Sequence, residues 1–142
     1  MTGLLVLPLV LQAAVMAVDE GWFHRRRGLP RWERVGHPLD TLSVAVTYIW
    51  ALAGGSTLGY AVLAFGSCLF ITKDEFVHRR LCRPGECWVH ALLFVLHPIV
   101  FVAFALLLRA GHTALAGLQL AVTLGFGAYQ LLYWNLRWKP AR

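Results

Sequence analysis

The chain has 142 residues, of which 58% are hydrophobic and only 14% are charged, and its mean hydropathy is +0.62. Ordinary soluble domains contain about 45–50% apolar and about 25% charged residues, so this composition excludes a soluble globular protein. The net charge of +6 alone would suit an anionic partner, but the basic residues flank long apolar blocks, as in membrane proteins. We therefore expect a single transmembrane domain over residues 1–142. We expect it to lie in the lipid bilayer and not to bind nucleic acid.

Five apolar runs predict five helices, each close to the length of about 20 residues that crosses a bilayer. In chain order, their expected bounds are about 2–26, 30–52, 56–81, 85–109 and 113–135. The breaks pair Gly or Pro with short polar residues, as tight turns do, and Pro30 and Pro84 suit the first turn of the helices that they open. The first run lacks the basic residues that precede the apolar core of a secretory signal, so we interpret it as a transmembrane helix. The expected fold class is an all-α, polytopic membrane bundle.

The basic residues predict the orientation of this bundle, because Lys and Arg near helix ends stay on the cytoplasmic side. Of the thirteen Lys and Arg residues, only Arg109 falls on the side opposite to the other twelve when five helices cross the membrane. We expect the N-terminus outside, the C-terminus in the cytoplasm, and the protein in a bacterial inner membrane.

Two of the expected cytoplasmic hairpins resemble each other. Between residues 19 and 37 the first contains Asp-Glu, His-Arg-Arg, Pro, Glu and His, and the second contains the same types in the same order between residues 74 and 90. We interpret this as an internal duplication, with repeat 1 over about 2–52, repeat 2 over about 56–109 and an extra helix over about 113–135. The two repeats would then be related by a pseudo-two-fold axis along the membrane normal.

Acidic residues and histidines concentrate in these two hairpins. All seven Asp and Glu residues lie in or beside the repeat, together with five of the six histidines. At about 100° per residue, four helices each present a carboxylate and an imidazole one turn apart on one face. The candidate metal ligands are Glu20, His24, Glu33, His37, Glu75, His78, Glu86 and His90. The candidates for orienting groups or additional ligands are Asp19, Asp40, Asp74 and His97.

The cost of buried charge favours a site filled by metal ions. An ionised side chain at membrane depth costs about 2.5–3.5 kcal/mol, and several glutamates facing one core would also repel one another. Two metal ions would neutralise these groups, and mixed Glu and His ligands suit iron, manganese or zinc, of which we favour iron. The alternative interpretation is that Glu20 and Glu75 pair with neighbouring arginines at the interface and only mark the topology.

The stretches 19–40 and 74–97 resemble the ligand-bearing helices of di-iron carboxylate proteins, in which Glu and Glu-x-x-His motifs project into a helical core. Glu75-x-x-His78 has that spacing, whereas the other three pairs are Glu-x-x-x-His. The chain is also similar in concept to membrane fatty acid hydroxylases and desaturases, although their HxxxH and HxxHH boxes are missing from it. The resemblance implies a dimetal oxidoreductase that acts with O2 on an apolar, lipid-like substrate near the cytoplasmic face.

Other functions stay open at this point. The sequence contains no NAD or flavin motif, so an oxidoreductase would need an external electron donor at the basic cytoplasmic face. Divalent metal transport or sensing also requires Glu and His within the membrane. Haem binding has enough histidines but leaves the glutamates unexplained, and a small structural subunit of a larger membrane complex, or a homo-oligomer, would fit the short chain.

Overall fold

The structure, a computed structural model, describes residues 2–139, with the exception of the Val77 side chain. Over this range it contains five helical rods and no strand, which confirms the predicted all-α class. The bounds of the rods lie within two residues of the predicted ones.

Three of the five rods change their helical type along their length. In the first rod, α1 (Thr2–Val18) continues through the π-helical segment η1 (Asp19–His24) into α2 (Arg25–Arg27). The second rod is α3 (Arg31–Leu52). The third consists of α4 (Thr57–Phe70), the 3-10 segment η2 (Ile71–Asp74) and α5 (Glu75–Leu81). The fourth is α6 (Pro84–Arg109), and the fifth is α7 (Thr113–Leu132) followed by the π-helical segment η3 (Tyr133–Arg137).

Glycine and proline define the turns between the rods. Gly28, Gly54 and Gly111 have φ angles of 77°, 76° and 79°, a left-handed conformation that glycine adopts without a steric penalty. Pro84 lies in the first turn of α6, as predicted. Pro30 instead precedes α3 as its N-cap residue, so the helix begins one residue later than expected.

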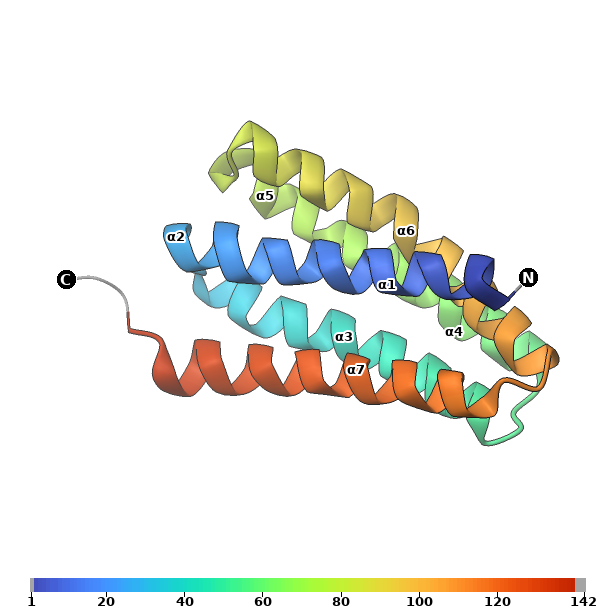
Figure 1. The fold of residues 1–142 in the computed structure, drawn as a ribbon. Helices are drawn as coiled ribbons and strands as arrows, with labels where there is room; N and C mark the ends of the chain where they lie inside the picture. The colour runs from blue at the N-terminus through green and yellow to red at the C-terminus, as the bar shows by residue number, and fades with distance from the viewer. Residues whose placement is uncertain (1, 140–142) are drawn as a thin grey trace.

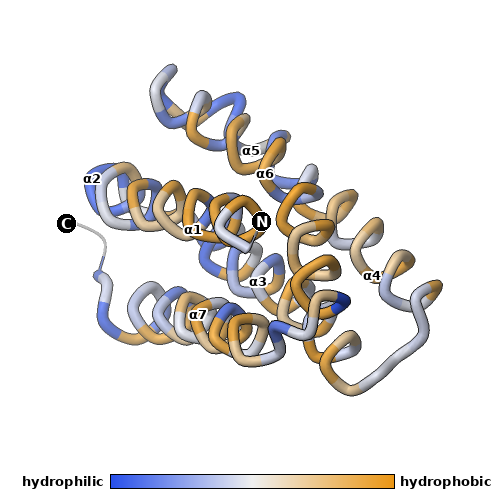
Figure 2. Tube along the Cα trace, turned by 45° about the vertical axis from the view of Figure 1, so that its right-hand side comes forward, coloured by the Kyte–Doolittle hydropathy of each residue, from blue (hydrophilic) through white to orange (hydrophobic). Residues whose placement is uncertain are grey.

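The rods run side by side, and their turns gather at two opposite ends (Figure 1). One end contains the turn at 28–30, the turn at 82–83 and η3, and we name it the charged end. The N-terminus and the turns at 53–56 and 110–112 lie at the other end. Hydrophilic residues concentrate around α2 and α5 at the charged end, whereas α1, α4 and α6 are largely hydrophobic along their length (Figure 2).

The half of the bundle away from the charged end has an apolar core. α1 packs against α6, and α3 packs against both α4 and α7. We name this half the apolar half, and two clusters of buried side chains fill it. The first cluster consists of Val44, Tyr48, Phe101, Phe104 and Ala116, and the second of Leu9, Val100, Ala103 and Leu107. The rings of Tyr48 and Phe104 stack with their centroids 3.8 Å apart. Burial of these side chains provides the main apolar contact between the rods.

Three rods are long and apolar enough to cross a membrane, namely Thr2–Arg27, Pro84–Arg109 and Thr113–Arg137. Large apolar side chains such as Leu58 and Val102 also point outward and are 75% and 61% exposed, as expected for a surface in contact with lipid. These features indicate a membrane protein. Of the other two rods, α3 carries more polar residues, and the third rod has only the 14 residues of α4 as regular apolar helix. Five crossings, the orientation and the duplication therefore stay predictions.

Candidate metal centre

A group of buried carboxylates and histidines lies at the charged end, contributed by η1, α3, α5 and α6. Each of these residues is at most 9% exposed. We name them the carboxylate–histidine cluster: Asp19, Glu20, His24, Glu33, His37, His78, Glu86 and His90. Seven of the eight predicted ligands therefore lie together, and Asp19 joins them.

The π-helical segment η1 explains how two consecutive acids reach the same histidine. His24 Nε2 lies 3.3 Å from Asp19 Oδ2, and His24 Nδ1 lies 3.3 Å from Glu20 Oε2. A π-helix forms i→i+5 hydrogen bonds, so its turn is wider than that of an α-helix and the residue five positions before His24 comes onto its face. The helical distortion thus adds Asp19 to the cluster.

Four residues form a first set of possible ligands: Asp19, His24, Glu86 and His90. His90 Nε2 lies 3.1 Å from each oxygen of the Asp19 carboxylate. His24 Nε2 lies 3.7 Å from Glu86 Oε1. One ligand atom from each of the four lies within 4.8 Å of the others, which is close enough for all of them to bind one ion.

Glu33, His37 and His78 form a second set, which shares no residue with the first. His78 Nε2 lies 3.6 Å from Glu33 Oε1, and the His37 and His78 rings are 6.1 Å apart. Because the two sets have no member in common, two ions could occupy them at the same time.

Many polar atoms of the cluster are buried without a hydrogen-bond partner. Among the described residues, these include both ring nitrogens of His24 and His78, Nδ1 of His90, and Oε1 of Glu33. Each such atom costs about 1–3 kcal/mol when it stays unsatisfied. Two atoms that bind one ion at about 2.1 Å and about 90–120° apart are separated by about 3.0–3.6 Å. The separations of 3.3 Å between His24 Nε2 and Asp19 Oδ2 and of 3.6 Å between His78 Nε2 and Glu33 Oε1 lie in this range, so these donor atoms fit metal ions.

Glu20 is held from the fifth rod, by Gln130 of α7 and Trp134 of η3. Gln130 Nε2 donates a hydrogen bond of 2.7 Å to Glu20 Oε1, and Trp134 Nε1 donates one of 2.8 Å to Glu20 Oε2. The same carboxylate faces Nδ1 of His24 at 3.3 Å and Nδ1 of His37 at 3.7 Å. A carboxylate in this position fixes the tautomer and ring orientation of metal-binding histidines.

Among the lysines and arginines that the structure describes, Arg27 is the one that contacts the cluster directly. Its Nη2 atom lies 2.8 Å from Glu33 Oε2 and 2.9 Å from Glu86 Oε1, and its side chain is only 18% exposed. One guanidinium stands against the four carboxylates of Asp19, Glu20, Glu33 and Glu86. The excess of negative charge in a buried place therefore favours the binding of further cations.

Glu75 is the predicted ligand that lies outside the cluster, because it is exposed at the start of α5. Asp74 is buried instead, with Oδ2 4.0 Å from His37 Nε2. Asp74 precedes His78 by four residues and Glu75 precedes it by three. Viewed down the helix axis, the two acids therefore lie to opposite sides of His78. Only the side of Asp74 faces the core, which corrects the predicted placement of Glu75.

Asp40 and His97, the two candidates that lie farther from the charged end, have hydrogen-bond partners of their own. Asp40 Oδ1 accepts a hydrogen bond of 2.6 Å from Lys73 Nζ, and Lys73 Nζ also lies 3.1 Å from Asp74 Oδ1. His97 Nε2 lies 2.9 Å from Ser67 Oγ, one turn or more beyond the cluster. Neither Asp40 nor His97 belongs to a set of possible ligands in the described part of the chain.

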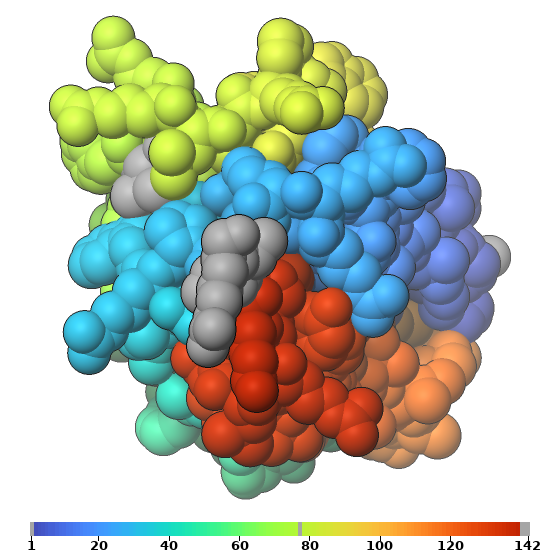
Figure 3. All heavy atoms as spheres, turned by 90° about the vertical axis from the view of Figure 1, so that its left-hand side faces the viewer, coloured from blue at the N-terminus to red at the C-terminus, as the bar shows by residue number. Residues whose placement is uncertain are grey.

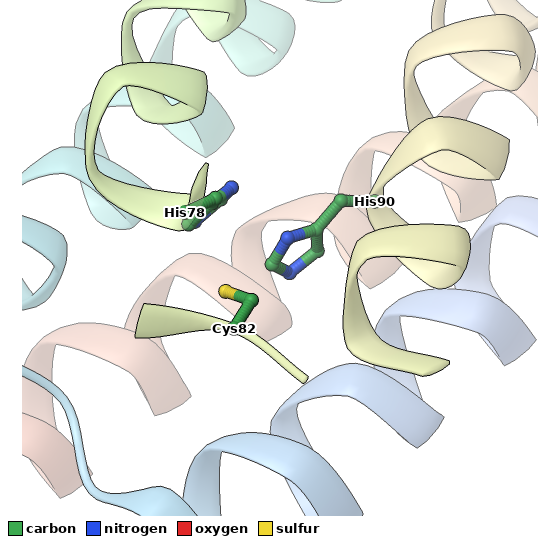
Figure 4. A group of neighbouring side chains, drawn as sticks. All are labelled: His78, Cys82 and His90. Carbon is green, nitrogen blue, oxygen red and sulfur yellow. The ribbon is translucent and has the colours of Figure 1, made fainter. Parts of the chain in front are cut away.

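Cys82 is a further possible ligand that was not among the sequence candidates. Figure 4 shows its side chain converging with those of His78 and His90, and the three form another set of neighbouring ligand atoms. Burial raises the pKa of the Cys82 thiol, with a smaller contribution from the Glu86 carboxylate, so the sulfur is protonated at neutral pH. This set takes His90 from the first set and His78 from the second, so an ion bound at Cys82 would compete with both.

A cavity of about 120 Å3 adjoins the cluster in the centre of the bundle. One wall consists of polar groups of the cluster: Asp19, Glu20, His37, His78 and His90. The apolar part of the lining includes Met16, Leu93, Phe94, Val122 and Phe126. An apolar molecule in this cavity would therefore lie directly beside the possible ligands.

The chain matches no family model, no curated protein and no solved structure. Its function is therefore argued from the chemistry of the site.

Proposed function

We propose that the carboxylate–histidine cluster binds two metal ions. The first ion is held by Asp19, His24, Glu86 and His90. The second is held by Glu33, His37 and His78. One observation carries this proposal: buried, unpartnered donor atoms lie at the separations that two ligands of one ion have. Hydrogen bonding among the described residues does not satisfy these atoms, whereas an ion would take Nε2 of His24, Nε2 of His78 and Oε1 of Glu33 as ligands.

In this proposal Asp19 and Glu20 exchange the roles that the sequence suggests. Asp19 is a ligand, since both of its oxygens lie 3.1 Å from His90 Nε2. Glu20 orients His24 and His37 through their Nδ1 atoms, because its own oxygens are already engaged by Gln130 and Trp134. Nε2 of each of these two histidines is then free to bind metal.

We propose iron as the metal, with manganese or zinc as the alternatives. Imidazole and carboxylate ligands suit all three metals, and the protein supplies no sulfur ligand in either set. The second set provides only three residues and so leaves coordination positions open, which a catalytic metal needs. A haem would leave the buried carboxylates beside the histidines without a role.

We further propose that the protein is an oxidoreductase that uses O2 to oxidise an apolar, lipid-like substrate. Paired redox metals, when bound, would supply the reduction of O2. The residues of this chain would position the substrate and exclude water, because Leu93, Phe94 and Phe126 line the cavity next to the cluster. This combination of apolar cavity and metal ligands favours oxidation of a membrane-soluble molecule.

The same proposal assigns five membrane crossings, with the charged end in the cytoplasm. The first repeat contains α1 and α3, and the second contains α4 and α6. A two-fold axis between the repeats would convert the contact of α1 with α6 into a contact of α4 with α3, and both contacts are present. Residues of α2, α5 and η3 form the face seen in Figure 3. The exposed basic residues there include Arg26, Arg80 and Arg137, and an acidic electron donor would dock on them.

Transport of a divalent metal is a second candidate, because His97, Ser67 and Gln12 extend buried polar groups beyond the cluster. The apolar half argues against it. Tyr48, Phe101 and Phe104 are at most 3% exposed and close the bundle on the far side of His97. Metal uptake by proteoliposomes separates the two candidates, since an enzyme holds a fixed number of ions and transports none.

Metal analysis of the purified protein tests the proposal. We expect two ions per chain in the wild type and at most one in His90→Ala and in Glu33→Gln, which remove a ligand from the first and the second set respectively. Glu75→Gln is the matched control, because Glu75 belongs to the same sequence repeat but is exposed. It should keep both ions.

Helical circular dichroism and gel filtration in detergent show whether each variant is folded. A folded wild type without metal after growth with iron, manganese and zinc would contradict the proposal. Equal metal content in His90→Ala, Glu33→Gln and Glu75→Gln would also contradict it.

A further inference from the structure

The cavity beside the cluster has a second polar wall at its inner end. His97 and Gln12 both line it and are 6% and 7% exposed. Ser67 holds Nε2 of His97 at 2.9 Å, whereas Gln12 Nε2 is 3.5 Å from His97 Nδ1, a distance at which a hydrogen bond is weak. A polar atom of a ligand would therefore improve the hydrogen bonding of this pair.

The lining of the cavity favours entry from the side of the bundle. Tyr48, Val100 and Phe101 fill the apolar half beyond His97, so that direction is closed. α1 and α7 lie on the same side of the bundle, toward the viewer in Figure 1, and both contribute to the cavity lining. Val122 of α7 lines the cavity and is still 36% exposed. An opening at this level faces the hydrocarbon region if the rods span the membrane.

We propose that this cavity binds a single hydrocarbon chain with an uncharged oxygen, a hydroxyl or a carbonyl, at one end. The oxygen is bound by His97 and Gln12, and the chain extends along Leu93 and Phe94 toward the cluster. An uncharged head group is favoured because the ionisable residues in the lining are acids and histidines, with no Arg or Lys to bind a carboxylate. The inference deepens the proposed function, because it defines which end of the substrate lies beside the metal ligands.

The spacing along α6 gives the length of the chain. His97 and His90 are seven residues apart on one helix, which corresponds to about 10 Å at about 1.5 Å per residue. An extended chain advances by about 1.2 Å per bond, so about eight bonds separate the bound oxygen from the carbon beside His90. The site therefore fits a medium-length alcohol or aldehyde.

Photolabelling with two probes tests this binding site. The first probe is a decan-1-ol that carries a diazirine near its methyl end, and the second is the corresponding decane without the hydroxyl group. Both are incubated with the detergent-solubilised full chain, and the labelled peptides are identified by mass spectrometry. We expect the alcohol to label the cavity residues Met16 and Leu93 about two- to tenfold more than the alkane does, the range for one neutral hydrogen bond.

Three variants separate the cavity from general partition into detergent. Leu93→Trp fills the cavity and should reduce labelling of Met16 at least tenfold, whereas Leu106→Trp, at a position of α6 that is 44% exposed, should leave it unchanged. Gln12→Leu should remove the preference for the alcohol but keep the labelling by the alkane. Equal labelling by both probes in the wild type, or labels confined to outward residues such as Leu4 and Val102, would overturn the proposal.

The test does not depend on bound metal, since it is performed on metal-depleted and on metal-loaded protein. Cavity labelling in a wild-type protein that binds no metal would support the lipid site and reject the metal centre. Two bound ions with no cavity labelling would have the opposite meaning.

Discussion

The two halves of the bundle differ in how their helices are built and packed. In the apolar half, regular α-helices bury Tyr48, Phe104 and Leu107 completely. At the charged end, π-helical and 3-10 segments interrupt the rods. His24 and Glu33 are equally buried there, but both ring nitrogens of His24 and Oε1 of Glu33 have no hydrogen-bond partner among the described residues. The comparison indicates that the apolar half supplies stability, which allows the charged end to hold buried polar atoms without hydrogen-bond partners. In our proposal, bound metal ions satisfy these atoms.

The largest effect on stability is expected in the apolar half. Phe104→Ala removes a fully buried ring that stacks on Tyr48, and should cost about 3–5 kcal/mol of unfolding free energy. Unfolding in detergent and denaturant measures this loss. Phe65→Ala, at an outward position that is 66% exposed, is the control and should cost far less. The folded fraction of Phe104→Ala should still bind two ions, and loss of its metal would show that the halves are not independent.

Removal of metal should have the next largest effect. At a free metal concentration of about 100 times Kd, binding stabilises the folded state by about 2.7 kcal/mol, and a chelator should abolish this gain. His24→Ala lacks a ligand and should lose most of the difference between metal-loaded and chelator-treated protein. An unfolding free energy of the wild type that is the same with and without chelator would mean that the buried charges are satisfied without metal.

A smaller effect is expected from Trp134→Phe, which deletes the 2.8 Å hydrogen bond from Trp134 Nε1 to Glu20 Oε2 but keeps an aromatic ring. Loss of such an orienting contact typically weakens metal affinity by about 10–100-fold, and we expect the lower end of this range. Isothermal titration with the metal that the protein contains measures the affinity. Trp22→Phe is the control, since Trp22 is 53% exposed on the same rod as Glu20. If both variants bind equally well, Glu20 does not need its contact with Trp134.

The smallest effect distinguishes two neighbouring acids. Glu75→Gln should change the unfolding free energy by less than about 0.5 kcal/mol, as for most exposed substitutions. Asp74→Asn should have a larger effect, because it weakens the contact with Lys73 Nζ at 3.1 Å inside the bundle. The reverse order, measured by denaturant unfolding, would restore Glu75 as the residue that faces the core.

The sequence predicts the rods well because their ends are marked by strong local signals. Gly28, Gly54 and Gly111 terminate helices by adopting conformations that other residues avoid, and Pro84 opens the next one. The placement of His24, His37, His78 and His90 in one group follows from the four expected hairpin helices. Buried polar residues in an otherwise apolar chain have few other places to go.

The finer arrangement depends on helix geometry that periodicity does not reveal. A rule of about 100° per residue places Glu20 with His24 and leaves Asp19 off that face, whereas the π-helical segment includes both. The repeat aligns Glu75 with Glu20, but spacing from the histidine makes Asp74 the equivalent acid. Gln130 had a detectable signal, since it is one of two glutamines in the largely apolar helix α7, whereas Trp134 lies beyond that helix in η3 and no polar pattern marks it.

X-ray absorption spectroscopy of the metal bound to the intact protein tests the central claim most directly. The account predicts a first shell of nitrogen and oxygen atoms at about 2.0–2.2 Å, with the outer scattering of imidazole rings, and a reduced imidazole contribution in His90→Ala. A shell dominated by sulfur at about 2.3 Å, or one without imidazole, would contradict it, because the ions would then lie outside the carboxylate–histidine cluster.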